Sequence, residues 1–538
     1  MRVFDAASEV RAGAGGVQLR ETRPAFVPGL RDAIRRLPRT LEPWVDQRFC
    51  LALLMLAVAL AARAAQFGNP VVQVDDQFYL LMGDRMLDGA LPYVDIWDRK
   101  PIGLFLIYAG IRLLGGSGVL EYQLVATIAA AATGYAIARI ARQVAPPHGA
   151  AAAGLVYILY LGIFGGEAGQ SPVFYNLLVV LAAGAMLRAL LRPGFGRASF
   201  FWGLAATGLM GLALQVKYTV LFEGAFFGLA LMWRARREGV ATARIVAMGA
   251  AWLGAALLPT AIAWGGYAAI GHGADFYQAN FESIFHRNPD EPWALFKRLG
   301  WIAMMLAPLG IVTWSGRVQL AGNRSADPRA THFLTGWMLA ALTGFILFGS
   351  WFDHYALPLL VPMAVLAAPA LGLRGAGLTL STPGVRWHVP AGLALMLFAS
   401  IASMMLIDNN RRQRGWGPQL AELAGFIQPR LQGCLFVYDG PVALYRVTGS
   451  CLPSRWAFPD HLYNRREEGA IGTDTLGEAE RIMGNKPKLV VRGERVEGHS
   501  NLRTWNYVDS ELARAYDPAF RTLTGGRRYI VWERRPGM

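Results

Sequence analysis

The sequence is poor in charged residues, in cysteine and in lysine. Only 17% of its 538 residues are charged, whereas 54% are hydrophobic, and apolar runs recur between residues 51 and 407. This composition excludes a soluble multidomain enzyme and indicates a polytopic membrane protein. The three cysteines are Cys50, at the start of the first apolar run, and Cys434 and Cys451 in the C-terminal polar part, and they leave no metal–cysteine site.

Positive charge is carried almost entirely by arginine, because only five of the 52 basic residues are lysines. The arginines cluster in short segments between apolar runs, as the positive-inside rule expects for cytoplasmic loops. Topology therefore explains the net charge of +15 better than a nucleic-acid partner does. Residues 1–48 are rich in arginine and contain no apolar stretch with a cleavage site, so they are predicted to be a cytoplasmic tail before a permanent membrane anchor.

Eleven apolar runs, the shorter ones with their flanks, are predicted to be membrane-spanning helices. They are residues 51–62, 124–137, 149–166, 173–187, 198–216, 218–233, 245–271, 299–316, 333–352, 355–373 and 389–407. A further run, 102–114, is shorter than the roughly 20 residues that a span needs, and Arg112 interrupts it. If it crossed the membrane, every arginine-rich loop after it would lie on the wrong side. It is therefore predicted to be a helix at the outer membrane surface, within a first external loop of residues 63–118.

Residues 408–538 follow the last predicted span and alternate helix-like and strand-like segments. The helix-like segments are 418–428 and 474–484, and the strand-like segments are 435–440, 488–493 and 527–533. We predict a small periplasmic α/β domain after a transmembrane domain of residues 49–407. An oxidising compartment would allow Cys434 and Cys451 to form a disulfide, and two free thiols are the alternative.

Residues 74–101 read VDDQFYLLMGDRMLDGALPYVDIWDRKP and place many carboxylates beside the membrane. Their apolar side chains repeat with helical spacing until Gly89, a typical C-terminal stop. Asp75 and Asp76 stand at the start of this short amphipathic helix, where the helix dipole favours negative charge. One interpretation is a helix cap. The other is that a carboxylate kept ionised there acts as general base toward an acceptor hydroxyl.

Three of the five lysines, Lys100, Lys217 and Lys297, fall at predicted external positions, against the positive-inside trend. Lys217 makes up almost the whole turn between two predicted spans, so its ammonium group lies close to the membrane edge. It either reaches the lipid head groups or joins Lys100 and Arg99 in binding a phosphate, whose developing charge the three cations stabilise. A lipid-linked phosphate fits such a cluster at membrane depth.

Other polar residues of the predicted external loops are weaker candidates for the same site, namely Glu167, His286, His354 and Tyr355. Each of them alone is more typical of an ordinary loop than of a catalytic centre. Carboxylate oxygens suit Mg²⁺ or Mn²⁺, so a divalent ion between acid and phosphate is compatible with the sequence. The spacing does not require one, and we predict no metal site and no required cofactor.

The chain resembles the GT-C glycosyltransferases in five features taken together. These are the acidic pair after the first span, the Lys-Pro that ends a segment of the same loop, the helix that follows, the eleven spans and the tail. Residues 51–407 look most similar to the branch with the protein O-mannosyltransferases and the lipid A aminoarabinose transferase. That family carries an Asp-Glu pair, which Asp75 and Asp76 match except in the second acid. It also carries Lys-Pro-Pro, which Lys100 and Pro101 match, while Ile102 departs from it.

The resemblance implies a GT-C fold in which Asp75 is the base, Asp76 a supporting acid and Lys100 the ligand of the lipid phosphate. Family members often carry a further acid at the external end of the third or fourth helix. Glu167 is the nearest match to it, although its local sequence fits poorly.

The residues and the resemblance together predict an inverting glycosyltransferase of the bacterial inner membrane, with its active site on the periplasmic side. It would take a hexosyl or pentosyl group from a polyprenyl phosphate, such as undecaprenyl phosphate, and pass it to a hydroxyl of an envelope acceptor. The acceptor is a lipid, a polysaccharide such as that of lipopolysaccharide, or a protein. The alternatives are a flippase for lipid-linked sugars, although no inverted repeat stands out, and a noncatalytic scaffold of envelope assembly.

Overall fold

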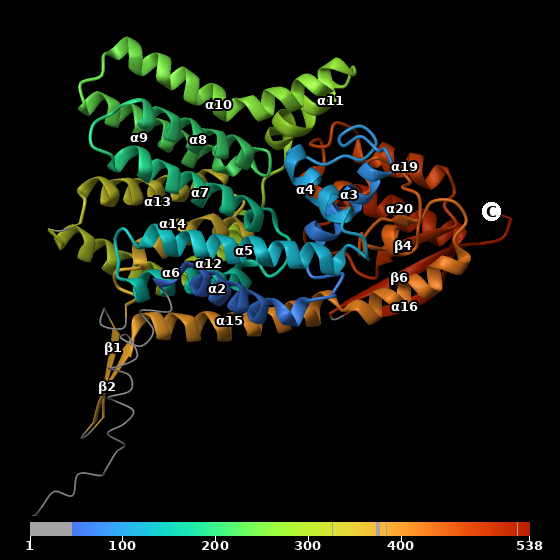
Figure 1. Cartoon of the computed structure of the whole chain (residues 1–538). Helices are drawn as coiled ribbons and strands as arrows, with labels where there is room; N and C mark the ends of the chain where they lie inside the picture. Colours follow the sequence, from blue (N-terminus) through green and yellow to red (C-terminus); the bar gives the residue numbers. More distant parts are fainter. Residues whose placement is uncertain (1–45, 325, 373–376, 383–384, 525, 538) are drawn as a thin grey trace, which may run out of the picture.

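The computed structural model describes residues 46–538 except 325, 373–376, 383–384, 525 and 538 (Figure 1). Helices form one bundle, and a region with a small sheet lies at one end of it, drawn in orange and red (Figure 1). Residues 1–45, the larger part of the predicted N-terminal tail, lie outside the described residues.

The bundle is built from eleven helices of very different lengths, which correspond to the eleven predicted segments. They are α2 (Arg48–Arg63), α5 (Val119–Ala141), α6 (Pro147–Tyr160), α7 (Ser171–Leu191), α8 (Arg197–Leu214), α9 (Leu221–Arg237), α10 (Thr242–Ala269), α12 (Pro292–Gly322), α13 (Pro328–Phe348), α14 (Leu360–Ala367) and α15 (Ala391–Arg414). Among the described residues, nine helical segments are long and apolar enough to cross a membrane, which confirms a polytopic membrane protein.

Two of the predicted spans, 218–233 and 355–373, fall outside these nine. Helix α9 has 17 residues and carries Glu223 and three arginines near its ends, which lower its apolar character. Helix α14 has eight residues and continues the 3-10 helix η6 (Asp353–Leu359), in which Pro358 cannot donate a backbone hydrogen bond. Both helices still pack inside the bundle, α9 against α8 and α13, and α14 against α6 and α12.

The predicted loop 63–118 holds two short helices, α3 (Val74–Leu87) and α4 (Ile102–Arg112). With 11 residues, α4 is about 16 Å long, too short to span a bilayer. The two helices cross closely at Gly83, where a Cβ atom would lie 2.8 Å from the carbonyl carbon of Tyr108. Only glycine fits there, so the sequence of α3 fixes how α4 packs on it.

The C-terminal region contains a mixed four-stranded sheet with helices around it. Its elements are α16 (Gly417–Ile427), β3 (Phe436–Val437), α17 (Leu444–Val447), α18 (Asp460–Tyr463), α19 (Thr475–Gly484), β4 (Leu489–Gly493), α20 (Leu502–Ala515), β5 (Tyr516–Thr524) and β6 (Arg527–Arg534). The strand order is β3-β4-β6-β5, with β3 parallel to β4 and the other pairs antiparallel. All five predicted segments are present, whereas α20 and β5 were not predicted.

A disulfide closes a loop within the C-terminal region, and the region packs on the first loop. Cys434 and Cys451 form a disulfide, the first of the two alternatives that the sequence left open. Phe458 packs on Phe78 of α3 with ring centroids 4.9 Å apart, and the backbone N–H of Trp97 donates to the carbonyl of Arg455 at 2.8 Å. These contacts place the C-terminal region directly over the segment that carries the predicted site.

Candidate active site

A cavity of about 1240 Å³ lies where the helix bundle, the first loop and the C-terminal region meet. One part of its wall is polar and includes Asp75, Asp98, Lys100, Lys217, His354, Tyr355 and Asp460. Another part is apolar and is formed by α8, α9, α10 and α13 through Leu214, Leu221, Phe222, Leu257, Leu347 and Phe348. The cavity therefore joins charged groups to an apolar surface within the bundle.

The two acids of α3 face the segment that precedes α7. Asp75 accepts a hydrogen bond from Nε2 of Gln170 at 3.1 Å, and Asp76 accepts one from the backbone N–H of Gly169 at 2.8 Å. Gln73 is the N-cap of α3, and no side chain caps this helix by a hydrogen bond. Both carboxylates therefore accept hydrogen bonds from the segment before α7, and neither of them caps α3 by a hydrogen bond.

Asp75 and Asp76 differ in their protonation. Burial opposes ionisation of Asp75, but the charge of Lys100, the Gln170 hydrogen bond and the charge of Lys217 outweigh it, so the pKa of Asp75 is lowered. Burial raises the pKa of Asp76 well above its usual range, and the neighbouring Asp75 adds to this. Only Asp75 lines the cavity, and it is the ionised member of the pair.

Lys100 faces Asp75 from the segment just before α4. Its Nζ lies 3.6 Å from Oδ2 of Asp98 and 5.5 Å from the ring centroid of Tyr79, and its carbonyl accepts a hydrogen bond from the Tyr93 hydroxyl at 2.9 Å. Burial lowers the pKa of the Lys100 ammonium, but the charges of Asp98 and Asp75 outweigh burial and leave the pKa raised. Lys100 is therefore a fixed, protonated cation.

Lys217 is buried and has no carboxylate partner among the described residues. Its Nζ lies 4.1 Å above the ring centroid of Tyr355, a cation–π contact. Burial lowers its pKa, and repulsion from Lys100 acts in the same direction. An anion bound in the cavity would offset both the burial of the Lys217 charge and its repulsion from Lys100.

A close contact between α4 and the end of α8 brings the two lysines together. The backbone N–H of Leu104 donates to the carbonyl of Gln215 at 3.1 Å. A Cβ atom on Gly103 would lie 2.6 Å from that same carbonyl oxygen, so glycine is needed for the approach. Lys100 stands just before α4 and Lys217 just after Gln215, and the contact therefore sets their separation.

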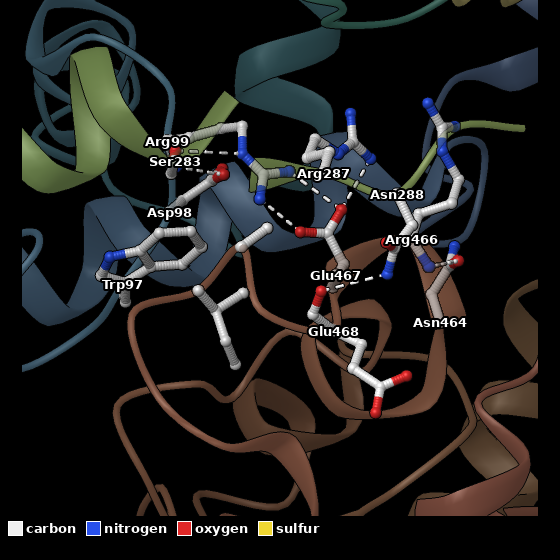
Figure 2. A network of polar contacts seen from close by, with 12 residues as sticks. Trp97, Asp98, Arg99, Ser283, Arg287, Asn288, Asn464, Arg466, Glu467 and Glu468 are labelled. Atoms are coloured by element: carbon white, nitrogen blue, oxygen red, sulfur yellow. Dashed lines mark hydrogen bonds and ion pairs between the residues drawn. The ribbon is translucent and has the colours of Figure 1, made fainter. Parts of the chain in front are cut away.

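Most other cations of the cavity wall are already bonded. Arg99 and Arg287 share Glu467, as Figure 2 shows, with Arg287 Nη2 2.6 Å from Oε1 of Glu467. Arg298 and Arg466 share Asp290 at 2.8 and 3.1 Å, and Arg414 donates to the carbonyl of Val72 at 2.7 Å. Lys100 and Lys217 are left as the cations with the weakest partners among those that line the described cavity.

The structure separates the nine predicted site residues into two groups. Six of them line the cavity, namely Asp75, Arg99, Lys100, Lys217, His354 and Tyr355. The other three, Asp76, Glu167 and His286, are not in its lining. Glu167 is buried and accepts a hydrogen bond from Nε2 of Gln73 at 2.9 Å, while the side chain of His286 is exposed.

No residue of the C-terminal region was among the predicted site residues, yet this region contributes to the site. Asp460, His461 and Glu467 line the cavity, although they follow Lys100 by more than 350 positions. No described residue forms a hydrogen bond or salt bridge with the Asp460 carboxylate, and burial, with Glu467 and Asp75, raises its pKa to about 7. His461 packs on Trp97 with ring centroids 4.8 Å apart, and burial lowers its pKa to about 3. None of these residues belongs to a local pattern.

No group of three or more His, Cys, Asp or Glu side chains is placed to hold a metal ion in the part of the chain that the structure describes. That no metal and no cofactor is required stays a prediction.

No family model and no curated protein matches the chain. Solved structures are similar to it along most of its length. ArnT from Cupriavidus metallidurans matches in the apo state with a TM-score of 0.62 and 15% identity over 89% of this chain and 97% of that chain. The same protein bound to undecaprenyl phosphate matches with a TM-score of 0.60 and 16% identity, covering 91% and 98%.

The archaeal oligosaccharyltransferase AglB from Archaeoglobus fulgidus, in complex with an inhibitory peptide and a dolichol phosphate, is more distant. It matches with a TM-score of 0.50 and 13% identity over 82% of this chain and 69% of that chain. At these identities the likeness establishes the fold. The predicted fold is thereby confirmed, and the chain has the GT-C fold of the lipid A aminoarabinose transferase ArnT.

Proposed function

We propose that the protein is an inverting membrane glycosyltransferase that moves a sugar from a polyprenyl-phosphate donor to an acceptor hydroxyl. One observation carries the proposal. An ionised carboxylate, Asp75, and two lysines without strong partners, Lys100 and Lys217, line one cavity that continues into an apolar wall. Two proteins of the same fold support the donor class, since ArnT binds undecaprenyl phosphate and AglB a dolichol phosphate.

The apolar part of the cavity suits a prenyl chain. It is formed by α8, α9, α10 and α13, and the side chains of Leu221 and Leu257, which line it, are exposed. A prenyl chain that lies against them stays in contact with lipid, while its phosphate reaches the lysines. The sugar then occupies the polar part, beneath the C-terminal region.

In the transfer step, the Asp75 carboxylate takes the proton of the acceptor hydroxyl, and the oxygen attacks the anomeric carbon. A new bond forms from this carbon to the acceptor oxygen, and the bond to the phosphate oxygen breaks with inversion. The electron pair stays on the leaving polyprenyl phosphate, whose added charge Lys100 and Lys217 stabilise. The proton on Asp75 then passes to water.

The neighbouring residues are assigned supporting roles. Gln170 orients Asp75 through its hydrogen bond, and Asp76 holds the loop before α7 through the N–H of Gly169. Tyr355 holds the Lys217 ammonium, and His354 lies beside it in the wall. We place Glu167 and His286, the weaker candidates, outside the reacting groups, because neither lines the cavity.

We propose that the cavity and the C-terminal region face the periplasm of a bacterial inner membrane. At the opposite end of the bundle, arginines of three turns lie together: Arg234 donates to the carbonyl of Arg192 and Arg329 to that of Leu191, both at 3.2 Å. This arrangement supports the positive-inside assignment of that end to the cytoplasm. The disulfide in the C-terminal region supports an oxidising compartment for the cavity end.

The acceptor is an envelope lipid, a polysaccharide or a protein, and the sugar is a hexose or a pentose. Mass spectrometry of envelope glycolipids, polysaccharides and proteins tests the function, in cells with the intact protein or the Asp75→Asn variant at equal membrane levels. A sugar lost only in the variant supports the transferase and names both the sugar and its acceptor. Unchanged glycans in the variant contradict the catalytic role of Asp75 and favour a scaffold or a flippase.

Asp88→Asn is the matched control for this experiment. Asp88 follows the last residue of the same helix, α3, but its side chain is exposed and pairs only with Arg85 at 3.4 Å. Its replacement therefore changes the charge of the helix without touching the cavity, and we expect the glycans to stay as in the intact protein.

A further inference from the structure

Three distant segments of the chain meet at one buried carboxylate, Glu467 (Figure 2). Nη1 of Arg99, from the segment before α4, lies 2.9 Å from its Oε1, and Nη2 of Arg99 contacts its Oε2. Nη2 of Arg287, from the segment before α12, lies 2.6 Å from Oε1. One carboxylate of the C-terminal region thus binds two guanidinium groups that line the cavity.

The turn that carries Glu467 is itself fixed by hydrogen bonds. The side chain of Asn464 accepts from the backbone N–H of Arg466 at 3.1 Å. The side chain of Asn288 donates to the carbonyls of Arg465 and Glu468 at 3.0 and 3.1 Å. The Asn288 side chain thus binds the backbone of the C-terminal region to the segment before α12. This holds Glu467 in a fixed position beside its two arginine partners.

Glu467 is ionised in this position. Burial opposes ionisation, but the charge and hydrogen bonds of Arg99 and then the charge of Arg287 outweigh it, so the pKa of Glu467 is strongly lowered. The side chain is only 3% exposed, and its negative charge is therefore balanced by the two arginines and not by water.

This pairing decides which cations are available to a phosphate. Arginine binds phosphate through two parallel hydrogen bonds and is a strong competitor for it. Arg99 is next to Lys100 in sequence and lines the same cavity, so an unpaired Arg99 would compete with the lysine. Two buried guanidinium groups without a carboxylate would also recruit another anion.

We propose that Glu467 is a positioning residue of the C-terminal region, which withdraws Arg99 and Arg287 from the donor phosphate and leaves the phosphate to Lys100 and Lys217. The inference rests on the proposed function and deepens it. It revises the assignment of Arg99 as a phosphate ligand, and it makes the C-terminal region a part of the active site.

The test is the Glu467→Gln variant, assayed in two ways. Its affinity for undecaprenyl phosphate in detergent micelles is measured by titration calorimetry, and the sugar that depends on Asp75 is quantified in envelopes. The amide cannot balance two guanidinium groups, so we expect undecaprenyl phosphate to bind more tightly, by about tenfold or more, because one unit of negative charge near the phosphate is removed. Transfer is expected to fall by about tenfold or more, because the phosphate is held away from Asp75 and is released slowly.

Tighter binding with slower transfer is a result that a merely structural role would not produce. The double variant Glu467→Gln with Arg99→Gln restores the net charge, and we expect both affinity and transfer to return most of the way to those of the intact protein. Glu468→Gln is the matched control, because Glu468 is the next residue and pairs with the exposed Arg503, away from the cavity. We expect it to change neither measurement.

Several results would overturn the inference. If Glu467→Gln binds undecaprenyl phosphate more weakly or with unchanged affinity, Glu467 does not restrain the arginines. If Arg99→Gln alone weakens binding by tenfold or more, Arg99 is itself a phosphate ligand. If the intact protein neither binds undecaprenyl phosphate nor transfers a sugar, the proposed function fails together with the inference, whereas a normal intact protein with unaffected variants refutes the inference alone.

Discussion

At the end of the bundle that carries the turns after α7, α9 and α12, basic residues hold helix ends together. Arg329 bonds to the carbonyl of Leu191 and to Asp327 at 2.7 Å, and Arg142 pairs with Asp46 at 2.8 Å. These are favourable interactions of cations with the C-terminal ends of helices and with neighbouring acids.

At the cavity end, the cations Lys100 and Lys217 are less exposed and lie inside the wall of a cavity. Both ends of the bundle carry positively charged side chains, but the groups that these side chains contact differ. Arginines with close carbonyl and carboxylate partners stabilise the bundle, whereas Lys100, with only a long contact to Asp98 at 3.6 Å, and Lys217, with no carboxylate partner among the described residues, remain available to a ligand. The predictions below test this difference.

The largest effect on stability is expected from the disulfide of the cavity end. Cys434 and Cys451 are 17 positions apart. Cys451→Ser should lower the free energy of unfolding by about 3 kcal/mol, as expected for closing a loop of this length. The thermal unfolding midpoint in detergent, measured with and without a reductant, shows the loss.

Cys50→Ser is the control at the other end of the bundle, where the arginines described above lie and which we call the arginine end. Its thiol is free and contacts only the side chain of Gln47 at 3.3 Å, so the replacement should leave the unfolding midpoint unchanged. Two additional thiols in the unreduced intact protein, detected by alkylation and mass spectrometry, would show that the disulfide does not form.

A second pair of variants compares one cation from each end. Lys217→Gln should weaken the binding of undecaprenyl phosphate by about 10- to 100-fold, the range for losing a charged hydrogen bond to phosphate. Arg329→Gln, which removes a cation of the arginine end, should leave this affinity unchanged. Equal effects of the two variants in titration calorimetry would mean that general charge, and not the cavity, attracts the lipid phosphate.

The acids of the two ends should respond to pH in opposite directions. The pKa of Asp460 in the folded protein is raised to about 7, so its charge opposes folding increasingly as the pH rises from about 4 to about 7. Asp460→Asn should therefore stabilise the protein by roughly 1 to 3 kcal/mol at pH 8, with little effect near pH 4. Unfolding midpoints of both proteins at pH 4, 6 and 8 give the result, and parallel curves would contradict it.

The smallest effect is expected from Asp327, at the N-terminus of α13. Its carboxylate accepts from the backbone N–H of Arg329 at 2.9 Å, and hydrogen bonding to the Arg329 side chain lowers its pKa despite some burial. Asp327→Ala should cost about 1 kcal/mol at neutral pH. Because the folded-state pKa is lowered, this contribution is present above the unfolded-state value and disappears in acid. A loss that is constant down to pH 3 would argue against an ionised cap.

Much of the membrane part could be predicted from local patterns. Hydrophobic runs mark the helices of the bundle, because a lipid environment demands long apolar segments whose backbone bonds are satisfied internally. The distribution of arginines among the loops excluded residues 102–114 from the predicted spans. Helix α4, which forms there, is indeed too short to cross a bilayer. The runs 218–233 and 355–373 were predicted as full spans, but proline and charged residues shorten the helices that form there.

The candidate site was predicted in part. Asp75 and Lys100 belong to one short stretch whose composition is unusual beside a membrane, and both line the cavity. His286 was singled out only because it is a polar residue in an external loop, and Glu167 also because it is the nearest match to a further acid of the family that the chain resembles. The local sequence does not show which polar side chains line a common cavity, and neither Glu167 nor His286 lines it.

The sequence by itself determined that this chain spans a membrane, that an acid and a lysine lie together beside the first span, and that a small α/β region follows the last helix. Only the tertiary structure decided that Arg99 is bound to Glu467, 368 positions away, and that Lys217 is left without a carboxylate. Helix formation and membrane insertion depend on periodicity and hydrophobicity over about twenty residues. The partner of a buried charge depends on which distant segments are packed against it, and no local pattern records that.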